Sequence, residues 1–235
     1  NSIERYSNIM EKIIIFLFLR LSLIICFFFL GIQTSKGRKY WPYMIPCILL
    51  FALNEGLRFG RGTDYNGYFF KYREILLDRA DQANEFLFQA FCKFNDNLGL
   101  PYQGVVFLMS LLLVLSAVIF LKDHKKVIGF SLPLFYLFSI EAENLMRWFL
   151  GFSFIFVGIS YLNKAKYVPF FLVGFIGCLF HNGLFLVIPI FYFIYFIKRP
   201  ILYPVIAIGI YLGLFFLFST EYMKSIASII SKVSI

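Results

Sequence analysis

The chain has 235 residues, of which 60% are hydrophobic and only 15% are charged, and its mean hydropathy is +0.80. This composition excludes an ordinary soluble globular protein and predicts an all-α, polytopic membrane protein, with residues 1–235 forming a single integral membrane domain. The net charge of +9 does not indicate nucleic-acid binding, because the basic residues form no clustered patch and no RNA-binding motif.

Apolar segments separated by charged residues predict about eight transmembrane helices, since a hydrocarbon core about 30 Å thick needs about 20 apolar residues per helix. The segments are 13–32, 41–57, 103–121, 127–140, 145–162, 167–180, 183–197 and 201–218. Segments 127–140 and 167–180 are short enough to be re-entrant or interfacial instead. The placement of the lysines and arginines favours two full crossings, because these residues fall in every second connection.

The charge of each connection predicts its side of the membrane. Basic residues fill the connections at 36–39, 122–126, 164–166 and 198–199, whereas those at 58–102 and 141–144 carry mixed or acidic charge. By the positive-inside rule, the basic connections are cytoplasmic and the other two lie on the outer face. The first apolar segment is long and lacks a small-residue cleavage site, so we do not expect it to be a removable signal peptide.

The long outer loop, residues 58–102, contains too many aromatic residues for a solvated coil. Between residues 84 and 98 the apolar side chains recur at helical spacing, while the polar ones face elsewhere. We therefore expect an amphipathic helix in the outer membrane interface, ending near Gly99 and Pro101. The apolar positions are Phe86, Leu87, Ala90, Phe91, Phe94 and Leu98, and the polar ones are Glu85, Gln89, Lys93 and Asp96.

The cysteines and histidines do not indicate a disulfide framework or a metal site. The four cysteines have no paired spacing and three of them lie in apolar segments, which is typical of small buried side chains. His124 and His181 fall on opposite sides of the predicted membrane, so they cannot share a zinc ion. We expect no metal ion and no other cofactor.

Seven ionisable residues from three connections are predicted to gather on the outer face. Charged groups at membrane depth are costly and usually mark a pathway or a site. Their convergence is therefore more informative than any one of them. They are Arg58, Arg61, Asp64, Glu141, Glu143, Arg147 and His181.

The segment LRFGRGTDY places two arginines beside two glycines, which allow the backbone to turn sharply. A planar guanidinium binds two phosphate oxygens at once, so Arg58 and Arg61 are candidate phosphate ligands. Arg58 could instead extend from its helix end into the interface. Asp64 could act as a general base or hold one of the arginines. Tyr65 and Tyr68 could stack on sugars or belong to an interfacial aromatic belt.

The remaining candidates each have two interpretations. Glu143 and Arg147 stand four residues apart, so on one helix they would pair with each other. Glu141 has no obvious partner and is a candidate catalytic carboxylate. His181 has a pKa that its surroundings can move near neutrality, although a lone histidine at a helix end is often structural. Arg20, in the first apolar segment, could extend outward or point inward.

Five motifs resemble the EpsG family of polytopic membrane proteins. They are LRFGRGTDY, YFFKY, NEFLFQAF, LMRW and FHNG, which together span roughly residues 13–197 when the first helix is included. The segment from Arg58 to Tyr68 is the strongest of them. Glu85, Arg147 and His181 occupy the positions of the family's later polar landmarks.

The chain also departs from the family pattern. Trp148 stands where a glutamine is usual, and Asn182 and Gly183 stand where the family has a pair of small residues. Family members are typically longer, so the resemblance implies that C-terminal helices of the full family are missing here.

The resemblance implies a multi-pass protein of the bacterial cytoplasmic (inner) membrane that serves exopolysaccharide, capsule or O-antigen assembly, similar to Wzy-type polysaccharide polymerases. Such a glycosyltransferase joins polyprenyl-pyrophosphate-linked oligosaccharide repeat units at the outer face. Its partners would be that lipid-linked glycan, the lipid bilayer and other polysaccharide assembly proteins. Two alternatives stay open: a transporter or flippase for a lipid-linked glycan, and a non-catalytic scaffold of a synthase complex.

The implied reaction assigns roles to the candidate residues. An acceptor hydroxyl attacks the anomeric carbon of the donor while polyprenyl pyrophosphate leaves. Positively charged groups stabilise the charge that develops on the phosphate, and a carboxylate or an imidazole removes the hydroxyl proton. The predicted phosphate and substrate ligands are Arg58, Arg61, Arg147, Tyr65 and Tyr68, and the predicted catalytic groups are Asp64, Glu141 and His181.

Overall fold

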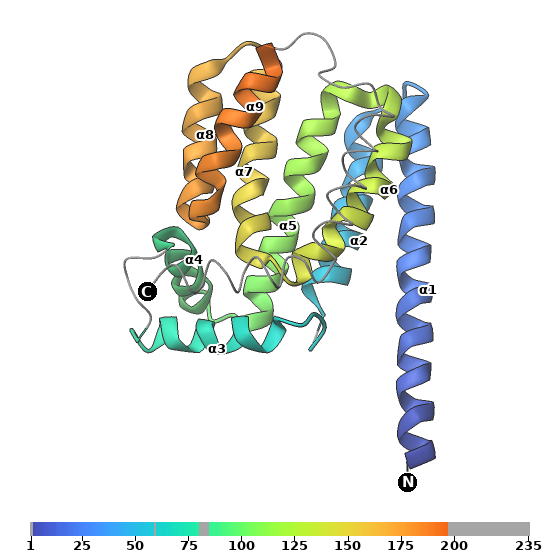
Figure 1. Ribbon diagram of the computed structural model, residues 1–235. Helices are drawn as coiled ribbons and strands as arrows, with labels where there is room; N and C mark the ends of the chain where they lie inside the picture. The colour runs from blue at the N-terminus through green and yellow to red at the C-terminus, as the bar shows by residue number, and fades with distance from the viewer. Residues whose placement is uncertain (1, 59, 80–84, 197–235) are drawn as a thin grey trace, which may run out of the picture. The chain divides into compact units, whose positions relative to one another are not determined.

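The computed structural model describes residues 2–58, 60–79 and 85–196, and every regular element in this part of the chain is a helix (Figure 1). The α-helices are α1 (Ser2–Ser35), α2 (Tyr40–Gly56), α3 (Tyr65–Leu76), α4 (Phe86–Asn97), α5 (Tyr102–Leu121), α6 (Ile128–Phe138), α7 (Met146–Leu162), α8 (Tyr167–Phe180) and α9 (Val187–Phe196). The short 3₁₀ helices are η1 (Lys122–Val127), η2 (Ser139–Glu143) and η3 (Asn182–Leu186). The predicted all-α fold is confirmed for these residues.

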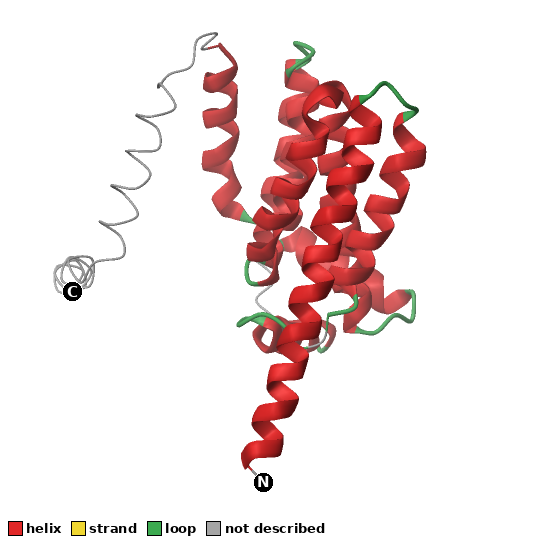
Figure 2. Ribbon diagram, turned by 90° about the vertical axis from the view of Figure 1, so that its right-hand side faces the viewer, coloured by secondary structure: helices red, strands yellow, loops and turns green. Residues whose placement is uncertain are grey.

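The chain divides into two compact units, Asn1–Tyr192 and Phe193–Ile235. The first unit contains α1 to α8 and all the charged residues discussed below. Figure 2 shows its helices with their short connecting loops. The predicted segment 201–218 and the end of segment 183–197 lie outside the described residues.

Among the described residues, two helical stretches are long and apolar enough to cross a bilayer, Leu17–Ser35 and Tyr102–Glu143. The second stretch is not one helix, because His124 leaves the helical backbone region within η1 (φ −119°, ψ 38°) and the chain reverses there between α5 and α6 (Figure 1). The other apolar helices, α7, α8 and the stretch Asn182–Phe196, are shorter. The number of crossings therefore stays a prediction.

The two kinds of connection lie at opposite ends of the first unit (Figure 1). The basic turns that follow α1, α5 and α7 gather at one end. At the other end α2 finishes, α5 and α7 begin, and α3 and α4 lie across the helix ends. The helix directions thus separate the connections into the same two groups as their charge does.

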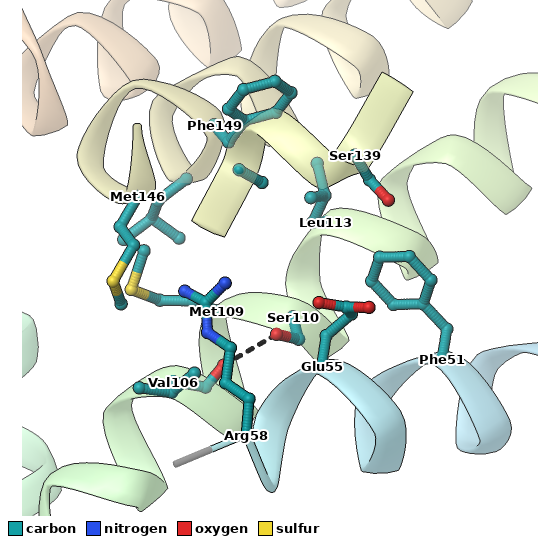
Figure 3. Close-up of a pocket in the computed structure, with 12 residues that line it drawn as sticks. Phe51, Glu55, Arg58, Val106, Met109, Ser110, Leu113, Ser139, Met146 and Phe149 are labelled. Atoms are coloured by element: carbon teal, nitrogen blue, oxygen red, sulfur yellow. Dashed lines mark hydrogen bonds between the residues drawn. The ribbon is translucent and has the colours of Figure 1, made fainter. Parts of the chain in front are cut away.

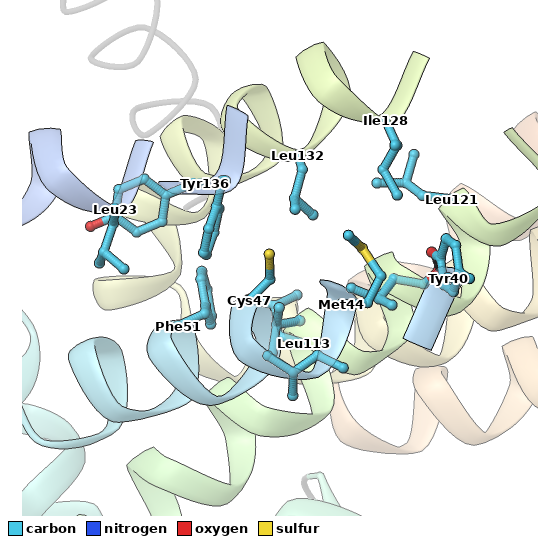
Figure 4. Close-up of a cluster of buried hydrophobic side chains, with 14 residues drawn as sticks. Leu23, Tyr40, Met44, Cys47, Phe51, Leu113, Leu121, Ile128, Leu132 and Tyr136 are labelled. Carbon is cyan, nitrogen blue, oxygen red and sulfur yellow. Dashed lines mark hydrogen bonds between the residues drawn. The ribbon is translucent and has the colours of Figure 1, made fainter. Parts of the chain in front are cut away.

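Buried aromatic and aliphatic side chains join α1, α2, α5 and α6 (Figure 4). Tyr136 stands in the middle of this cluster, with its ring 5.7 Å from that of Phe27 and 5.9 Å from that of Phe51, both edge to face. A second cluster lies beneath α3 and α4, where Tyr65 and Tyr72 pack at 5.4 and 5.5 Å on the ring of Tyr102. These two clusters fix the ends of the helices that carry the charged residues.

Small residues, Gly151 and Gly158 among them, bring α7 and α8 into close contact. A Cβ atom at Gly151 would lie 2.5 Å from the carbonyl oxygen of Gly177, and one at Gly158 would lie 3.3 Å from the ring of Phe170. The two backbones can approach this closely only because no side chain separates them.

The loop 58–102 contains two helices instead of the single one predicted. Helix α3 was missed, because its apolar residues are mixed with charged ones. Helix α4 confirms the predicted helix, but its packed face is Phe88, Cys92 and Asn95, whereas the predicted apolar residues Phe86 and Phe94 are exposed. A polar residue can be buried here because the Asn95 amide donates to two carbonyl oxygens, at 2.9 and 3.1 Å.

Candidate functional site

The glycine-rich segment after α2 folds against η2. Gly60 and Gly62 both have left-handed backbone angles (φ +63° and +98°), which a glycine adopts without strain. A Cβ atom at Gly62 would lie 3.1 Å from the carbonyl oxygen of Glu143. The next residue, Thr63, donates its backbone N–H to the side-chain oxygen of Asn144 at 2.8 Å. The segment therefore holds Arg61 next to the start of α7.

Five charged residues form what we call the arginine cluster: Arg20, Glu55, Arg58, Arg61 and Glu143. The Glu143 carboxylate contacts Arg20, lies 2.8 Å from Nε of Arg61, and lies 4.0 Å from Nη1 of Arg58. Nη2 of Arg61 also lies 2.6 Å from the Glu55 carboxylate. Arg61 thus bridges the two glutamates, and Glu143 joins α1, the glycine-rich segment and η2.

A cavity of about 20 Å³ borders this cluster between α2, α5 and the start of α7 (Figure 3). Its polar lining comes from Glu55, Arg58, Ser110 and Ser139. Figure 3 shows the side chains of Glu55 and Arg58 pointing toward it. The volume is enough for one water molecule. Nε of the buried Arg58 side chain has no hydrogen-bond partner within the described part of the chain. A water molecule in this cavity could accept a hydrogen bond from it.

Two expectations about this region are now decided. The predicted pairing of Glu143 with Arg147 is wrong, because η2 ends at Glu143 and α7 begins only at Met146, so the two residues do not share a helix face. Arg20 points inward and not outward, because the buried carboxylate of Glu143 supplies its partner.

Four residues form a second group, which we call the Glu85 cluster: Lys71, Glu85, Arg147 and His181. One carboxylate oxygen of Glu85 contacts Arg147 and lies 3.9 Å from Nζ of Lys71, and the other lies 2.8 Å from Nδ1 of His181. Glu85 precedes α4 with a left-handed backbone (φ +57°). The cluster therefore joins α3, α7 and the end of α8 through one carboxylate.

In the Glu85 cluster the carboxylate is buried, whereas the other three side chains are partly exposed to solvent. The Glu85 side chain is 9% exposed, while those of Arg147, His181 and Lys71 are 25%, 32% and 34% exposed. The guanidinium of Arg147 lies over the ring of Tyr68, 5.6 Å from its centroid. Such a cation over an aromatic face is attracted to the ring. Arg147 is therefore held on two sides and still accessible.

Electrostatics favours a neutral imidazole at His181. Burial, and then the charge of Arg147, lower the pKa of His181 below its usual value. Burial and Arg147 likewise lower the pKa of Lys71. Since the Glu85 carboxylate can only accept, Nδ1 of His181 carries the proton and Nε2 presents a lone pair. This nitrogen can accept a proton from a bound hydroxyl group.

The other sequence candidates lie apart from these contacts. Asp64 and Glu141 are exposed, and no ion pair involves either of them within residues 2–58, 60–79 and 85–196. Tyr65 is buried with its hydroxyl against the Gln103 amide, so its ring is not presented at an open surface, and its substrate role stays a prediction. Tyr68 is half-buried beneath Arg147 and belongs to neither an exposed belt nor an open platform.

Two residues in the clusters were not recognised as site candidates. Glu55 could have been found, because it is a carboxylate inside the otherwise apolar segment 41–57. Lys71 interrupts the aromatic motif YFFKY, but nothing in that motif indicates its partner. The expected lack of a metal site remains a prediction; among the described residues no group of three or more histidine, cysteine, aspartate or glutamate side chains could hold a metal ion.

The fold and the two clusters define a helical protein that gathers buried and partly buried charged side chains at one end of the helices of its first unit. The model of the EpsG family matches residues 40–234, and the chain belongs to this family. The match begins later and extends further than the region 13–197 suggested by the motifs. The searches of curated proteins and of solved structures found no match.

Proposed function

We propose that the chain is a membrane polysaccharide polymerase, a glycosyltransferase that joins polyprenyl-pyrophosphate-linked oligosaccharide repeat units at the outer face of the bacterial cytoplasmic membrane. The observation that carries the proposal is the contact of His181 with Glu85 beside Arg147. A neutral imidazole oriented by a carboxylate is suited to general-base catalysis. Membership of the EpsG family supports the substrate class.

In the proposed reaction, His181 removes the proton of an acceptor sugar hydroxyl through Nε2. The hydroxyl oxygen bonds to the anomeric carbon of the donor, the bond from that carbon to the pyrophosphate breaks, and polyprenyl pyrophosphate leaves. Negative charge increases on the leaving pyrophosphate. Arg147 and Lys71 are exposed enough to contact it, and fixed cations at that position lower the barrier.

The arginine cluster stabilises the position of the helix α7 that carries Arg147. Glu143 and Arg147 are four residues apart, so their Cα atoms are separated by at most about 14 Å even with an extended backbone. Contacts of Glu143 with Arg20 and Arg61 hold η2, and therefore the beginning of α7, in place. Arg61 is the most exposed of the three arginines and is the one that could also contact a phosphate.

The proposed outer-face location depends on the topology of eight crossings. It is supported by the position of both clusters at the end opposite the basic turns (Figure 1). An Arg79→Cys variant, treated with a membrane-impermeant thiol reagent, should be labelled from outside intact cells. Labelling only from the cytoplasmic side would contradict the topology.

The activity test is in vitro elongation of a polyprenyl-pyrophosphate-linked repeat unit by the full chain in lipid vesicles. His181→Gln keeps a group that can contact Glu85 but removes the base, so the rate should fall about 100-fold or more. Asp96→Asn changes an exposed carboxylate of α4 that belongs to neither cluster and should keep most of the activity. Equal polymer yields from His181→Gln and the parent chain would reject His181 as the base.

The same experiment separates the alternative functions. A flippase would move the lipid-linked repeat unit across the vesicle membrane and make no polymer. A scaffold would raise polymer yield only when another synthase component is added, and His181→Gln would then have no effect. Polymer made by the purified chain alone, and lost in His181→Gln, is the outcome that supports the polymerase.

A further inference from the structure

A large apolar groove lies between α5, α6 and α7, with a volume of about 480 Å³. It forms because α6 packs mainly against α1, whereas α7 packs mainly against α5 and α8, so α6 and α7 stand apart. Twelve side chains line the groove, and all but two serines are apolar. Neither cluster of charged residues lies inside it.

One face of each of two helices forms the walls. On α6, Leu134, Phe135 and Phe138 recur at intervals of one and three residues, which places them on one side of the helix. On α7, Trp148 and Phe152 lie one turn apart and their rings stack at 4.7 Å. The ring of Phe135 lies 6.4 Å from that of Phe156 across the groove. The result is an apolar groove whose walls are largely aromatic.

The groove shares lining residues with the cavity at the arginine cluster, and it is connected to the Glu85 cluster through neighbouring residues of α7. Ser139 and Phe149 line the groove and also line the small cavity that contains Glu55 and Arg58. Trp148, at the same end of the groove, directly follows Arg147. An apolar surface therefore continues into a positively charged one at the corner between η2 and α7.

The charges at this corner suit a diphosphate. Among the described residues, the Glu85 cluster holds two permanent cations, Lys71 and Arg147, against one carboxylate. A ligand with a long apolar chain and a multiply charged phosphate end would place each part against a complementary surface. A zwitterionic phospholipid has no net charge to match this excess.

We propose that the groove binds the polyprenyl chain of a lipid pyrophosphate, with the diphosphate at the η2–α7 corner against the partly exposed Arg61 and Arg147. This inference rests on the proposed function, because it takes the donor of that reaction as the ligand. It adds the location of the lipid chain and the direction from which the donor reaches His181: the chain enters from the bilayer between α6 and α7.

Photo-crosslinking tests the groove without requiring catalysis. A benzophenone amino acid replaces Leu134, in the groove, or Leu172, on α8 outside it; the two leucines are 61% and 63% exposed and form a matched pair. The full chain is placed in vesicles of phosphatidylethanolamine and phosphatidylglycerol that contain radiolabelled polyprenyl pyrophosphate. Crosslinking at position 134 should exceed that at 172 by about tenfold. Labelled polyprenol, which lacks the diphosphate, should crosslink much less at 134.

Three results would overturn the proposal. Equal crosslinking at the two positions would mean that the groove takes no specific lipid. Labelled phosphatidylglycerol crosslinking as strongly as polyprenyl pyrophosphate at position 134 would assign the groove to bulk lipid. Crosslinking of position 134 to residues 197–235 or to a second copy would show that protein covers it.

A kinetic test separates the groove from the polymerase itself. Leu134→Trp narrows the groove, so KM should rise about tenfold for a donor with a full-length polyprenyl chain. The KM of Leu134→Trp should not change for a donor whose chain has two isoprene units. Leu172→Trp should not change the KM for either donor. An equal effect on both donors would reject the groove. If no variant and no parent chain makes polymer, the proposed function fails, and the crosslinking result alone decides the groove.

Discussion

The arginine cluster and the Glu85 cluster both place cationic side chains against buried glutamates, but the two clusters differ in exposure. In the arginine cluster, Glu143 and Arg58 are buried, and the groups they meet come from the same enclosed region between α1, α2 and η2. In the Glu85 cluster only the carboxylate is enclosed, and Arg147, Lys71 and His181 each remain partly open. Ion pairs of arginine with glutamate can therefore have different roles in the two clusters.

This difference in exposure distinguishes a structural role from a catalytic role. A buried ion pair cannot exchange its partner for a ligand without exposing an uncompensated charge, and breaking it is strongly destabilising. A cation that is one quarter to one third exposed can contact its carboxylate on one side and a substrate on the other. We therefore expect the arginine cluster to determine stability and the Glu85 cluster to determine activity.

The largest expected effect is on folding. Glu143→Ala removes the carboxylate that three arginines approach, and should reduce the free energy of unfolding by about 3–5 kcal/mol. The measurement is denaturant unfolding in detergent. Lys93→Ala, which breaks the exposed pair of Lys93 with Asp78, is the control and should cost at most about 1 kcal/mol. Equal losses would show that burial does not distinguish the two pairs.

A large loss of activity without unfolding is expected in the other cluster. Glu85→Gln keeps the shape of the side chain, but its amide favours the wrong tautomer of His181, and the elongation rate should fall by about 100-fold, no more than in His181→Gln, because Glu85 acts through that base. The rate is measured with saturating donor, and thermal unfolding is measured beside it. A stability loss as large as that of Glu143→Ala would contradict the division between the clusters.

A smaller effect is expected where the glycine-rich segment meets η2. Gly62→Ala places a Cβ atom 3.1 Å from the carbonyl oxygen of Glu143 and requires a left-handed backbone, so it should destabilise by about 1–3 kcal/mol. Gly67 lies within α3 with open space around it, and Gly67→Ala should instead stabilise by about 0.5–1 kcal/mol. Unfolding of both variants in the same detergent is the measurement, and two changes of the same sign would contradict the docked segment.

The smallest expected effect is a shift in pH dependence. In the parent chain, elongation should decline as the pH falls through the pKa of His181, which lies below its usual value because of burial and Arg147. Arg147→Gln removes a positive charge that opposes protonation, and leaves the charge of Glu85 less neutralised. The pKa of His181 should therefore rise, and the acidic limb of the rate profile should move to higher pH. An unchanged limb would show that another group is titrating.

Much of the fold could be predicted from local patterns, and the errors have specific causes. The apolar segments from 41–57 to 167–180 each contain a helix, because hydrophobicity and helix ends are properties of neighbouring residues. Helix α3 was missed because charged residues are mixed with its apolar ones. The packed face of α4 was misjudged because buried Asn95 depends on carbonyl partners that only the folded loop provides.

The residues of the two clusters were predicted only in part, since Glu55 and Lys71 were missed, and their contacts were not predicted. Charge alternation gathered Arg58, Arg61, Arg147 and His181 at one end of the chain's helices, and the structure brings each of them into a cluster. The partners were assigned incorrectly: a spacing of four residues suggested that Glu143 pairs with Arg147. The short 3₁₀ helix η2 breaks that spacing and gives each residue a different partner.

The amino-acid sequence by itself determined the helical class, the order of the helices and the end of the bundle at which the charged residues meet, because these depend on composition and on short-range periodicity. Only the tertiary structure decided which carboxylate forms an ion pair with which cation. The contacts of Glu85 join residues 62 and 96 positions apart, and that of Glu143 with Arg20 spans 123. Such pairings depend on how the helices pack, and no local pattern encodes them.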